Sequence, residues 1–324
     1  MRSLRGSYGS GICRNGGIQC GTILAACCRC VLAQTYRNWE LLIVDDGSTD
    51  GSVEQVRALY RDPRIRVLRQ DNKGKPTALN WALRELKGEF YAIQDADDLS
   101  CPNRIERLVE AMRAHPEVAA VYSGHDVILN GRRIAPQFRA KSPDVCRRDI
   151  ERFAMPAHDP TGMYRMSMVG DVRYAPELPV VEGYDYILRV GERWPMLVVG
   201  ECLYSYRVHA SSVTHADPER RQRLVEQVIR RACQRRGISF EQRPVTRHRL
   251  TGGGTAAAQD NNLAAQFIQS TLDQRRAKHR LAAVRTGLQC ACLHPLNVHY
   301  HKALIYALSP WWLIRRLRRT GMDD

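Results

Sequence analysis

The sequence predicts an α/β fold in which a sheet with parallel strands is covered by helices. Apolar, strand-like runs alternate along the chain with helical stretches of about 10–15 residues, the pattern of βαβ units. The apolar share of 44% is ordinary for a globular protein. With 324 residues, the chain can hold one large α/β domain with an appendage, or two domains.

The alternation can be followed from residue 31 onward. We expect strands at 40–44, 65–68, 90–93 and 118–122, and helices at 52–60, 75–86 and 102–114. The later elements are less regular: a hairpin at Asn130-Gly131, a loop at 157–162, a helix at 182–193, and closing strands at 197–199 and 202–208. A basic helix is then expected to about residue 236, a Gly-rich linker near 250–262, and further helices without an evident core of their own.

Carboxylates follow two of the expected strands. Asp45 and Asp46 come after 40–44, and Asp95 and Asp97, spaced D-x-D, come after 90–93. Ligands bind at the carboxyl ends of strands in open α/β sheets, so both acid pairs are expected at one binding edge. Clustered acids need a compensating cation or hydrogen bonds, and their oxygens suit Mg²⁺ or Mn²⁺ bridged to a phosphate. The alternative is a solvated acidic turn that caps the next helix.

Four segments carry a resemblance to a known family: VLAQTYRNWELLIVDDGSTD at 31–50, NKGKPTALNWAL at 72–83, DADD at 95–98 and YRVHASSVT at 206–214. Together, and in this order, they resemble the inverting family 2 glycosyltransferases, which have the GT-A fold. The resemblance covers residues 31–215. It implies transfer of a sugar from a nucleoside-diphosphate sugar, with UDP as the expected nucleotide, to a hydroxyl of a glycan or lipid-linked acceptor in cell-surface polysaccharide biosynthesis.

The same resemblance implies roles for the residues that bind the donor. Asp45 and Asp46 would contact the base and the ribose, because carboxylates accept from N–H groups and hydroxyls. Lys73, Gly74 and Lys75 would lie over the nucleotide, where the glycine allows close approach and the lysines offset phosphate charge.

A divalent metal ion is the implied cofactor. Asp97, Asp95 and His209 would hold Mg²⁺ or Mn²⁺, with Asp97 as the more direct ligand and Asp95 facing the ribose or the metal. The ion would neutralise the departing diphosphate.

Inversion at the anomeric carbon needs one general base, placed opposite the leaving group. The family commonly presents a Glu-Asp pair at the start of a helix that here reads Glu182-Gly183-Tyr184-Asp185, so Gly183 occupies the place of the second acid. The base is expected to be Glu182 or Asp185, with Glu182 preferred, or to be absent. The alternative is that both acids merely favour the positive end of the helix.

Residues 1–30 depart from the family pattern. They are rich in Gly, Cys and Arg, show no helical or strand periodicity, and contain nothing like the family's first strand with its Pro-x-Tyr-Asn-like loop. We expect this segment to be irregular and the sheet to lack its first strand, and a shifted reading frame or a wrong start upstream would explain the change at Val31. The alternatives for function are a catalytically impaired, interaction-only relative, or a nucleotidyltransferase.

The positive charge lies mostly in the region 216–324. The net charge is +15, and this region alone has 20 Lys and Arg against 8 Asp and Glu. Trp311 and Trp312 precede a cluster of arginines from Arg315 on, which predicts a helix in a membrane interface. The alternatives are packing on the catalytic domain and nucleic-acid binding, which no nucleic-acid motif supports. No apolar run reaches the length of a membrane-spanning helix, so we expect a cytoplasmic protein with peripheral contact at the inner face of the membrane.

Overall fold

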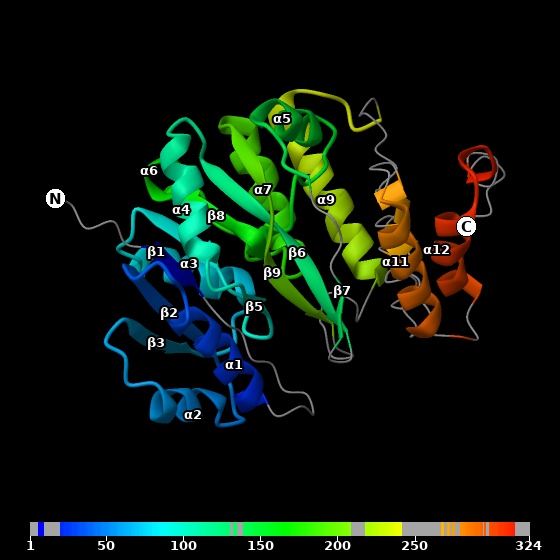
Figure 1. Cartoon of the computed structure of the whole chain (residues 1–324). Helices are drawn as coiled ribbons and strands as arrows, with labels where there is room; N and C mark the ends of the chain where they lie inside the picture. The colour runs from blue at the N-terminus through cyan, green and yellow to red at the C-terminus, as the bar shows by residue number, and fades with distance from the viewer. Residues whose placement is uncertain are drawn as a thin grey trace. The chain divides into compact units, whose positions relative to one another are not determined.

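A computed structural model of the chain describes residues 6–9, 20–129, 132–134, 139–208, 218–241, 267–268, 271–272, 274–275, 279–293, 295 and 298–314. The chain divides into two compact units (Figure 1). The first comprises Met1–Ser212 and Arg220–Arg247, and the second Val213–Glu219 and His248–Asp324.

The first unit contains the sheet. Its strands are β1 (Gly6–Gly9), β2 (Trp39–Asp46), β3 (Ile65–Gln70), β4 (Phe90–Ile93), β5 (Leu99–Ser100), β6 (Ala120–Leu129), β7 (Arg132–Ile134), β8 (Gly162–Arg165) and β9 (Met196–Val208). Its helices are α1 (Cys20–Leu32), α2 (Ser52–Leu59), α3 (Lys75–Glu85), α4 (Arg104–Ala114), α5 (Pro143–Glu151), α6 (Met166–Val169), α7 (Glu182–Arg193) and α9 (Pro218–Arg236), with a 3₁₀ turn, η1, at Asp159–Thr161. The expected helices at 52–60, 75–86, 102–114 and 182–193 are therefore confirmed, within two residues at each end.

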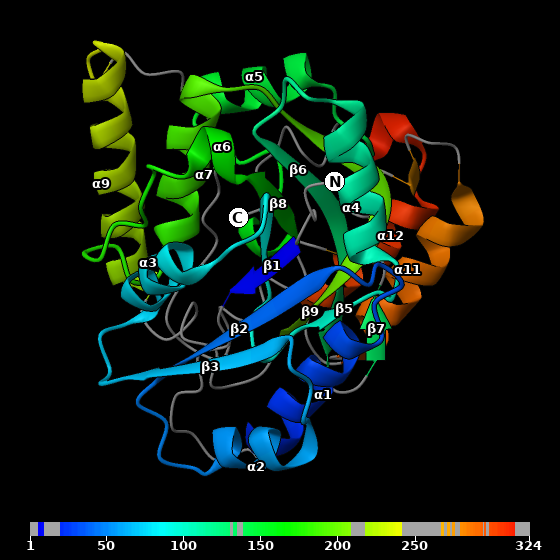
Figure 2. The same ribbon diagram turned by 90° about the vertical axis from the view of Figure 1, so that its left-hand side faces the viewer.

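Within the described residues the strands form one mixed sheet in the order β3-β2-β1-β4-β8-β6-β9-β5, with β7 paired to β6 (Figure 2). β1 to β4 are parallel, so the carboxyl ends of β2 and β4 lie at one edge, as expected. β8 runs antiparallel to both β4 and β6. The two closing strands expected at 197–199 and 202–208 are one strand, β9, whose pairing with β6 shifts register around Gly124.

Helices cover both faces of the parallel part of the sheet. Leu41 and Ile43 of β2 pack in a core with α1, α2 and α4. Leu42 and Val44 point to the opposite face and pack against α3. Successive side chains of a strand point to opposite faces, so a continuous apolar run such as β2 suits a strand that is buried on both sides.

The expectation that the sheet lacks its first strand is wrong. β1 lies between β2 and β4 and is parallel to both, with Gly6 opposite Trp39 on one side and Phe90 on the other. The segment Gly-Ser-Tyr-Gly has almost no apolar character. Hydrogen bonds of the backbone to two neighbouring strands define it, and hydrophobic periodicity does not report such bonds.

The expectation of an irregular segment is also wrong for residues 20–30, which belong to α1. Leu24, Cys27, Cys28 and Val31 are buried at the spacing i, i+3, i+4 and i+7, which is the apolar stripe of a helix. The stripe is visible in the sequence only if cysteine is counted as a small apolar residue, which is how a buried free thiol behaves.

Helix α9 belongs to the first unit, whereas we expected 216–324 to form one separate region. Val225, Val228, Ala232 and Cys233 are buried in the larger core of that unit. A basic helix with a short apolar stripe therefore packs on the first unit from Arg220 on, and the first unit extends to Arg247 instead of ending near residue 215.

The second unit contains α11 (Arg280–Leu293) and α12 (Val298–Leu308). The two helices lie so close that a Cβ atom on Gly287 would fall 2.6 Å from Cα of Leu304. Contrary to expectation, this unit has a small core of its own, formed by Leu272, Tyr306 and Ile314.

The expected linker at 250–262, His209 and the arginines from Arg315 on lie outside the described residues. Among the helices that the structure describes, none is both long and apolar enough to cross a membrane.

Candidate active site

Asp45, the residue before the last of β2, is buried, and one of its two carboxylate oxygens accepts no hydrogen bond among the described residues. Its Oδ1 accepts a hydrogen bond of 2.8 Å from the backbone N–H of Ser48. Its Oδ2 lies 3.5 Å from Nε of Arg69 and has no hydrogen-bond partner among the described residues. A buried polar atom without a partner is costly, so this oxygen is a natural acceptor for a ligand.

Asp46, in contrast, binds the chain itself. It accepts hydrogen bonds from Nε2 of Gln70 at 2.7 Å and from the backbone N–H groups of Lys73 at 2.8 Å and Gly74 at 2.9 Å. Gly74 has a φ of 86°, which favours glycine, and stands directly before α3. The predicted donor-binding residues Asp46, Lys73 and Gly74 therefore lie together, with Asp46 fixing the turn that leads into α3.

The D-x-D acids Asp95 and Asp97 lie in the turn after β4, and both are partly exposed. The third acid, Asp98, is buried and anchors the turn to β9: it accepts 2.8 Å hydrogen bonds from the hydroxyl of Tyr204 and the backbone N–H of Arg207. Burial, reinforced by the charges of Asp97 and Asp95, raises the pKa of Asp98 well above its usual value. Asp98 thus fixes the turn to β9, while the carboxylates of Asp95 and Asp97 remain partly exposed to solvent.

Lys75, in the first turn of α3, joins the sheet edge to α7. Its Nζ lies 2.9 Å from Oδ1 of Asp95 and 3.4 Å from Oε1 of Glu182. Burial opposes the charge on Lys75, but Asp95 and Glu182 together raise its pKa well above the usual value. Burial also raises the pKa of Glu182, against the lowering effect of Lys75. The ammonium group of Lys75 therefore forms ion pairs with two acids from different parts of the fold, Asp95 and Glu182.

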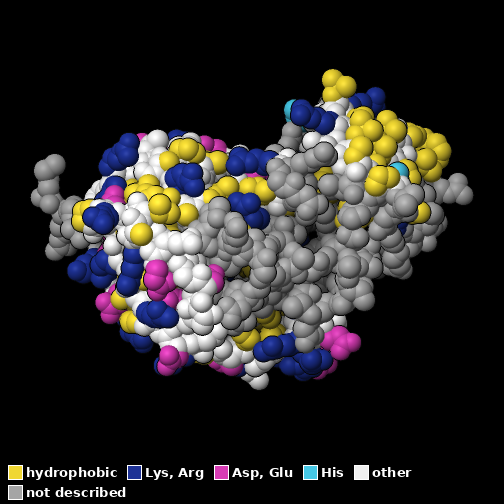
Figure 3. Space-filling view, turned by 90° about the horizontal axis from the view of Figure 1, so that it is seen from below, with side chains coloured by type: hydrophobic (Ala, Val, Ile, Leu, Met, Phe, Trp, Pro, Cys, Tyr) yellow, Lys and Arg dark blue, Asp and Glu magenta, His cyan; other side chains and the backbone are white. Residues whose placement is uncertain are grey.

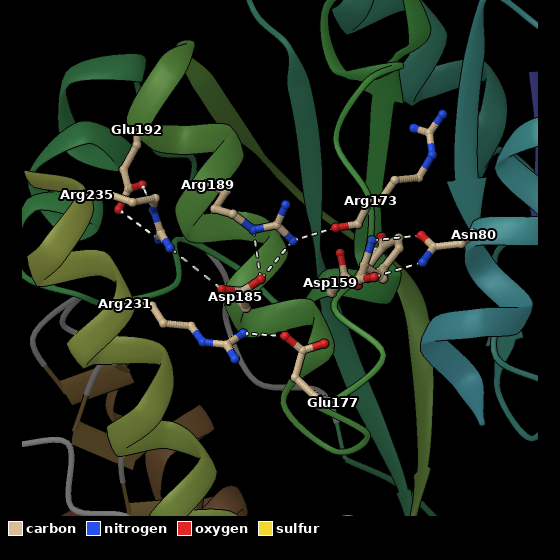
Figure 4. A network of polar contacts seen from close by, with 10 residues as sticks. Asn80, Asp159, Arg173, Glu177, Asp185, Arg189, Glu192, Arg231 and Arg235 are labelled. Carbon is tan, nitrogen blue, oxygen red and sulfur yellow. Dashed lines mark hydrogen bonds and ion pairs between the residues drawn. The ribbon is translucent and has the colours of Figure 1, made fainter. Parts of the chain in front are cut away.

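The two candidate bases lie in different surroundings. Glu182 faces Lys75 and the D-x-D turn. Asp185 contacts arginines instead: its Oδ2 accepts a 2.7 Å hydrogen bond from Nε of Arg189, and its Oδ1 lies 3.9 Å from Nη1 of Arg235 on α9 (Figure 4). The first turn of α7 thus places Glu182 at the candidate site and Asp185 at the contact with α9.

The oxygen atoms at this edge fit a hard divalent cation in part. Asp95 and Asp97 supply two carboxylates, and Mg²⁺ commonly uses one or two carboxylates together with water and substrate phosphates. The ammonium of Lys75 is now the cation next to Asp95. No cluster of three or more His, Cys, Asp or Glu residues that could hold a metal ion occurs in the described part of the chain. A metal would therefore have to displace Lys75 from Asp95 and draw on the donor phosphates.

A further acid, Asp159 of η1, lies at this site and was not predicted. Its Oδ1 accepts a short hydrogen bond from the hydroxyl of Tyr164, and its Oδ2 lies 3.5 Å from the hydroxyl of Tyr174. Burial raises the pKa of Asp159 to about 7, although the bond from Tyr164 and the charge of Lys75 lower it. The sequence at 157–162 predicts only a loop, and no motif there marks Asp159 as a residue of the site.

Comparison with known proteins assigns the class. A sequence model of glycosyl transferase family 2 matches residues 16–171, which include β2 to β4 and both acid pairs. These residues belong to that family. The match also begins upstream of residue 31, within the segment that was expected to be irregular.

Several named proteins are similar in sequence to this region. The putative glycosyltransferase EpsE of Bacillus subtilis is 37% identical over 129 residues, which are 37% of this chain and 46% of EpsE. The O-antigen biosynthesis protein RfbC of Myxococcus xanthus is 31% identical over 175 residues, 52% of this chain and 13% of that protein. The chain thus spans less than half the length of these curated relatives.

Solved structures confirm the fold class. TarS 1–349 of S. aureus, in complex with UDP-GlcNAc, has a TM-score of 0.62 and 16% identity, covering 98% of this chain and 92% of that chain. The mannosyltransferase PcManGT of Pyrobaculum calidifontis, in complex with GDP-Man and Mn²⁺, has a TM-score of 0.56 and 19% identity, covering 94% and 85%. The expected GT-A fold is therefore confirmed.

Proposed function

We propose that this chain transfers a sugar from a UDP-sugar to a hydroxyl of a glycan or lipid-linked acceptor, with inversion, in the biosynthesis of a cell-surface polysaccharide. The observation that carries the proposal is the convergence of three features at one edge of the sheet. They are Oδ2 of Asp45, which accepts no hydrogen bond among the described residues, the D-x-D turn, and the Lys75–Glu182 pair. The similarity to RfbC, an O-antigen biosynthesis protein, supports the class of product.

The donor nucleotide would lie along the carboxyl ends of β2 and β4. Oδ2 of Asp45 would accept a hydrogen bond from the uracil N–H or a ribose hydroxyl. Asp46 would act by holding Lys73 and Gly74, because three protein groups already donate to it. Its role is then to shape the turn over the nucleotide.

A divalent metal would be held by Asp97 and Asp95, with His209 as a further ligand. When bound, Mg²⁺ or Mn²⁺ would neutralise charge on the leaving diphosphate. Lys75 would have to leave Asp95, and its charge would remain available at the same edge, next to Glu182.

Glu182 is the proposed general base. It takes up the proton of the acceptor hydroxyl as the new bond to the anomeric carbon forms, on the side opposite the diphosphate. Its raised pKa makes it a stronger proton acceptor than an ordinary glutamate. Asp185 would act as a structural residue, because Arg189 and Arg235 already bind it.

The second unit is proposed to contact a membrane surface peripherally. Leu281 is 88% exposed and Trp312 is 66% exposed, and further large apolar side chains are exposed on α11 and α12 (Figure 3). Apolar and aromatic side chains beside basic ones suit the interface of an anionic membrane. Sedimentation with vesicles of anionic phospholipid tests this: the intact chain should bind, Trp312→Ala should bind less, and equal binding to neutral vesicles would argue against a role for the basic charge.

Calorimetry with UDP and Mn²⁺ tests the donor site. The intact chain should bind UDP more tightly with Mn²⁺ than without it, and Asp97→Ala should lose this gain. Equal binding by both proteins would refute the metal assignment, and no binding by either would favour a relative that has lost catalysis.

A further inference from the structure

Gly183, in the first turn of α7, leaves a space that another residue fills. A Cβ atom on Gly183 would lie 2.7 Å from both Cβ and Oδ2 of Asp159, closer than non-bonded atoms approach. The carboxyl group of Asp159 therefore occupies the volume in which a side chain at 183 would begin. It reaches the first turn of α7 from η1, a different part of the chain.

The surroundings of Asp159 contain one cation and two further acids. Lys75 stabilises the charge on Asp159, whereas Glu182 and Asp95 oppose it. The other polar groups that face it are the hydroxyls of Tyr164 and Tyr174. No arginine or lysine forms a direct ion pair with Asp159 among the described residues, so the hydrogen bond from Tyr164 is its direct stabilisation and Lys75 acts on its charge without an ion pair.

A residue with a purely structural role would not need to be an acid at this position. Asparagine has nearly the same shape and can accept the hydrogen bond from Tyr164 without the cost of a buried charge. Costly buried groups tend to be retained where they serve a site. The position of Asp159 next to Glu182 indicates which site that is.

We propose that Asp159 is a positioning residue of the transferase site, which enters through the space left by Gly183 and shares Lys75 with Asp95 and Glu182. This inference rests on the proposed function. When Asp159 is ionised, it attracts the ammonium of Lys75 and loosens its hold on Asp95, so that Asp95 can bind the donor or its metal. When Asp159 is protonated, Lys75 stays with Asp95 and the donor site is blocked.

Because the pKa of Asp159 is about 7, its charge changes near neutral pH. The affinity for UDP with Mn²⁺ should therefore increase as the pH rises through this value. The test compares the intact chain with Asp159→Asn by calorimetry at pH 6 and pH 8. At pH 8 we expect Asp159→Asn to bind UDP with Mn²⁺ on the order of tenfold more weakly than the intact chain, which corresponds to about one pKa unit of interaction energy. At pH 6, where Asp159 of the intact chain is protonated, the two proteins should bind nearly equally.

Asp171→Asn is the matched control, because Asp171 is an exposed acid paired with Arg193. It should bind like the intact chain at both pH values. Equal affinity of Asp159→Asn and the intact chain at pH 8 would overturn the inference. So would an equal loss at both pH values, which is the result that general structural damage produces.

A transplantation of the carboxyl group gives a second, independent test. Asp159→Ala should lose affinity at pH 8, and Asp159→Ala/Gly183→Asp should recover at least part of it by returning a carboxyl group to the same volume. No recovery in a folded double variant would count against the inference. These binding measurements do not require turnover, so failure of the inference is distinguishable from failure of the proposed function, which would appear as no sugar transfer by the intact chain.

Discussion

Oδ2 of Asp159 lies 2.7 Å from the point that a Cβ atom on Gly183 would occupy. Two residues from separate elements thus share one volume at the start of α7, and the acid of the pair comes from η1. The group of charged residues around Lys75 comes from four parts of the chain, with Lys75 on α3, Asp95 after β4, Asp159 on η1 and Glu182 on α7.

Gly183→Ala should destabilise the protein. The new methyl group would collide with Asp159, and overpacking of this kind typically costs about 1–3 kcal/mol. Thermal unfolding measures the loss. In an Asp159→Ala background the same substitution should cost clearly less, because the colliding atoms are gone. Equal costs in both backgrounds would show that the two residues do not compete for space.

Asp159→Asn should become more stable, relative to the intact chain, as the pH rises. The folded pKa of about 7 exceeds the ordinary value of 3.8, so between these values the folded protein holds a proton that the unfolded chain has released. As the pH rises across this window, the free energy of unfolding of the intact chain therefore falls, and this group contributes at most about 4 kcal/mol to the fall. Above the window the contribution is constant. Asparagine has no such loss. Chemical unfolding at pH 5 and pH 8 checks it, and a stability difference that is the same at both pH values would contradict it.

Lys75→Met should strengthen the binding of Mn²⁺ in the absence of nucleotide. The ammonium 2.9 Å from Asp95 competes with a metal for that carboxylate, and its removal takes away the one ion-pair partner that Asp95 and Glu182 have among the described residues. An increase in affinity on the order of tenfold is expected, because a nearby opposite charge shifts a carboxylate by one or more pKa units. Titration of the folded variant with Mn²⁺ measures the effect, and weaker binding would mean that Lys75 assists the metal.

Asp185→Asn and Glu182→Gln should differ in what they impair. Asp185 is buried and hydrogen-bonded to Arg189, so its neutralisation should cost about 1–3 kcal/mol of stability with little change in turnover per folded molecule. Glu182→Gln should reduce turnover by about 10²–10⁴-fold, the usual contribution of a general base, while UDP binding is kept. Unfolding curves and initial rates on both variants make the comparison. The roles would have to be exchanged if Asp185→Asn were the inactive, stable variant.

The sequence was sufficient for elements whose periodicity is local. Helix α7 begins at Glu182 and ends at Arg193 as predicted, because its apolar residues recur at helical spacing. Strand β1 could not be predicted, since its glycines have no pattern to detect and its stability comes from β2 and β4. Helix α1 was missed because cysteines formed part of its buried stripe.

The site was predictable as far as it follows strand ends. Asp45, Asp46, Asp95 and Asp97 lie at one edge because β2 and β4 run in the same direction, each paired with β1. The alternation of strands and helices implies this parallel direction, although it does not reveal β1 itself. Asp159 depends instead on a contact between η1 and α7 that no spacing encodes. The only trace in the sequence was Gly183, which stands where a second acid was expected.

Release of UDP from UDP-sugars by the purified chain with Mn²⁺ is the most direct test of the proposed function, and it can be followed with water as the acceptor. We expect the intact chain to release UDP from at least one of UDP-glucose, UDP-galactose and their N-acetylated forms. Glu182→Gln should reduce the rate of this release by about 10²–10⁴-fold. Turnover that is equal in the intact chain and in Glu182→Gln, or no turnover of any of these donors, would contradict the account.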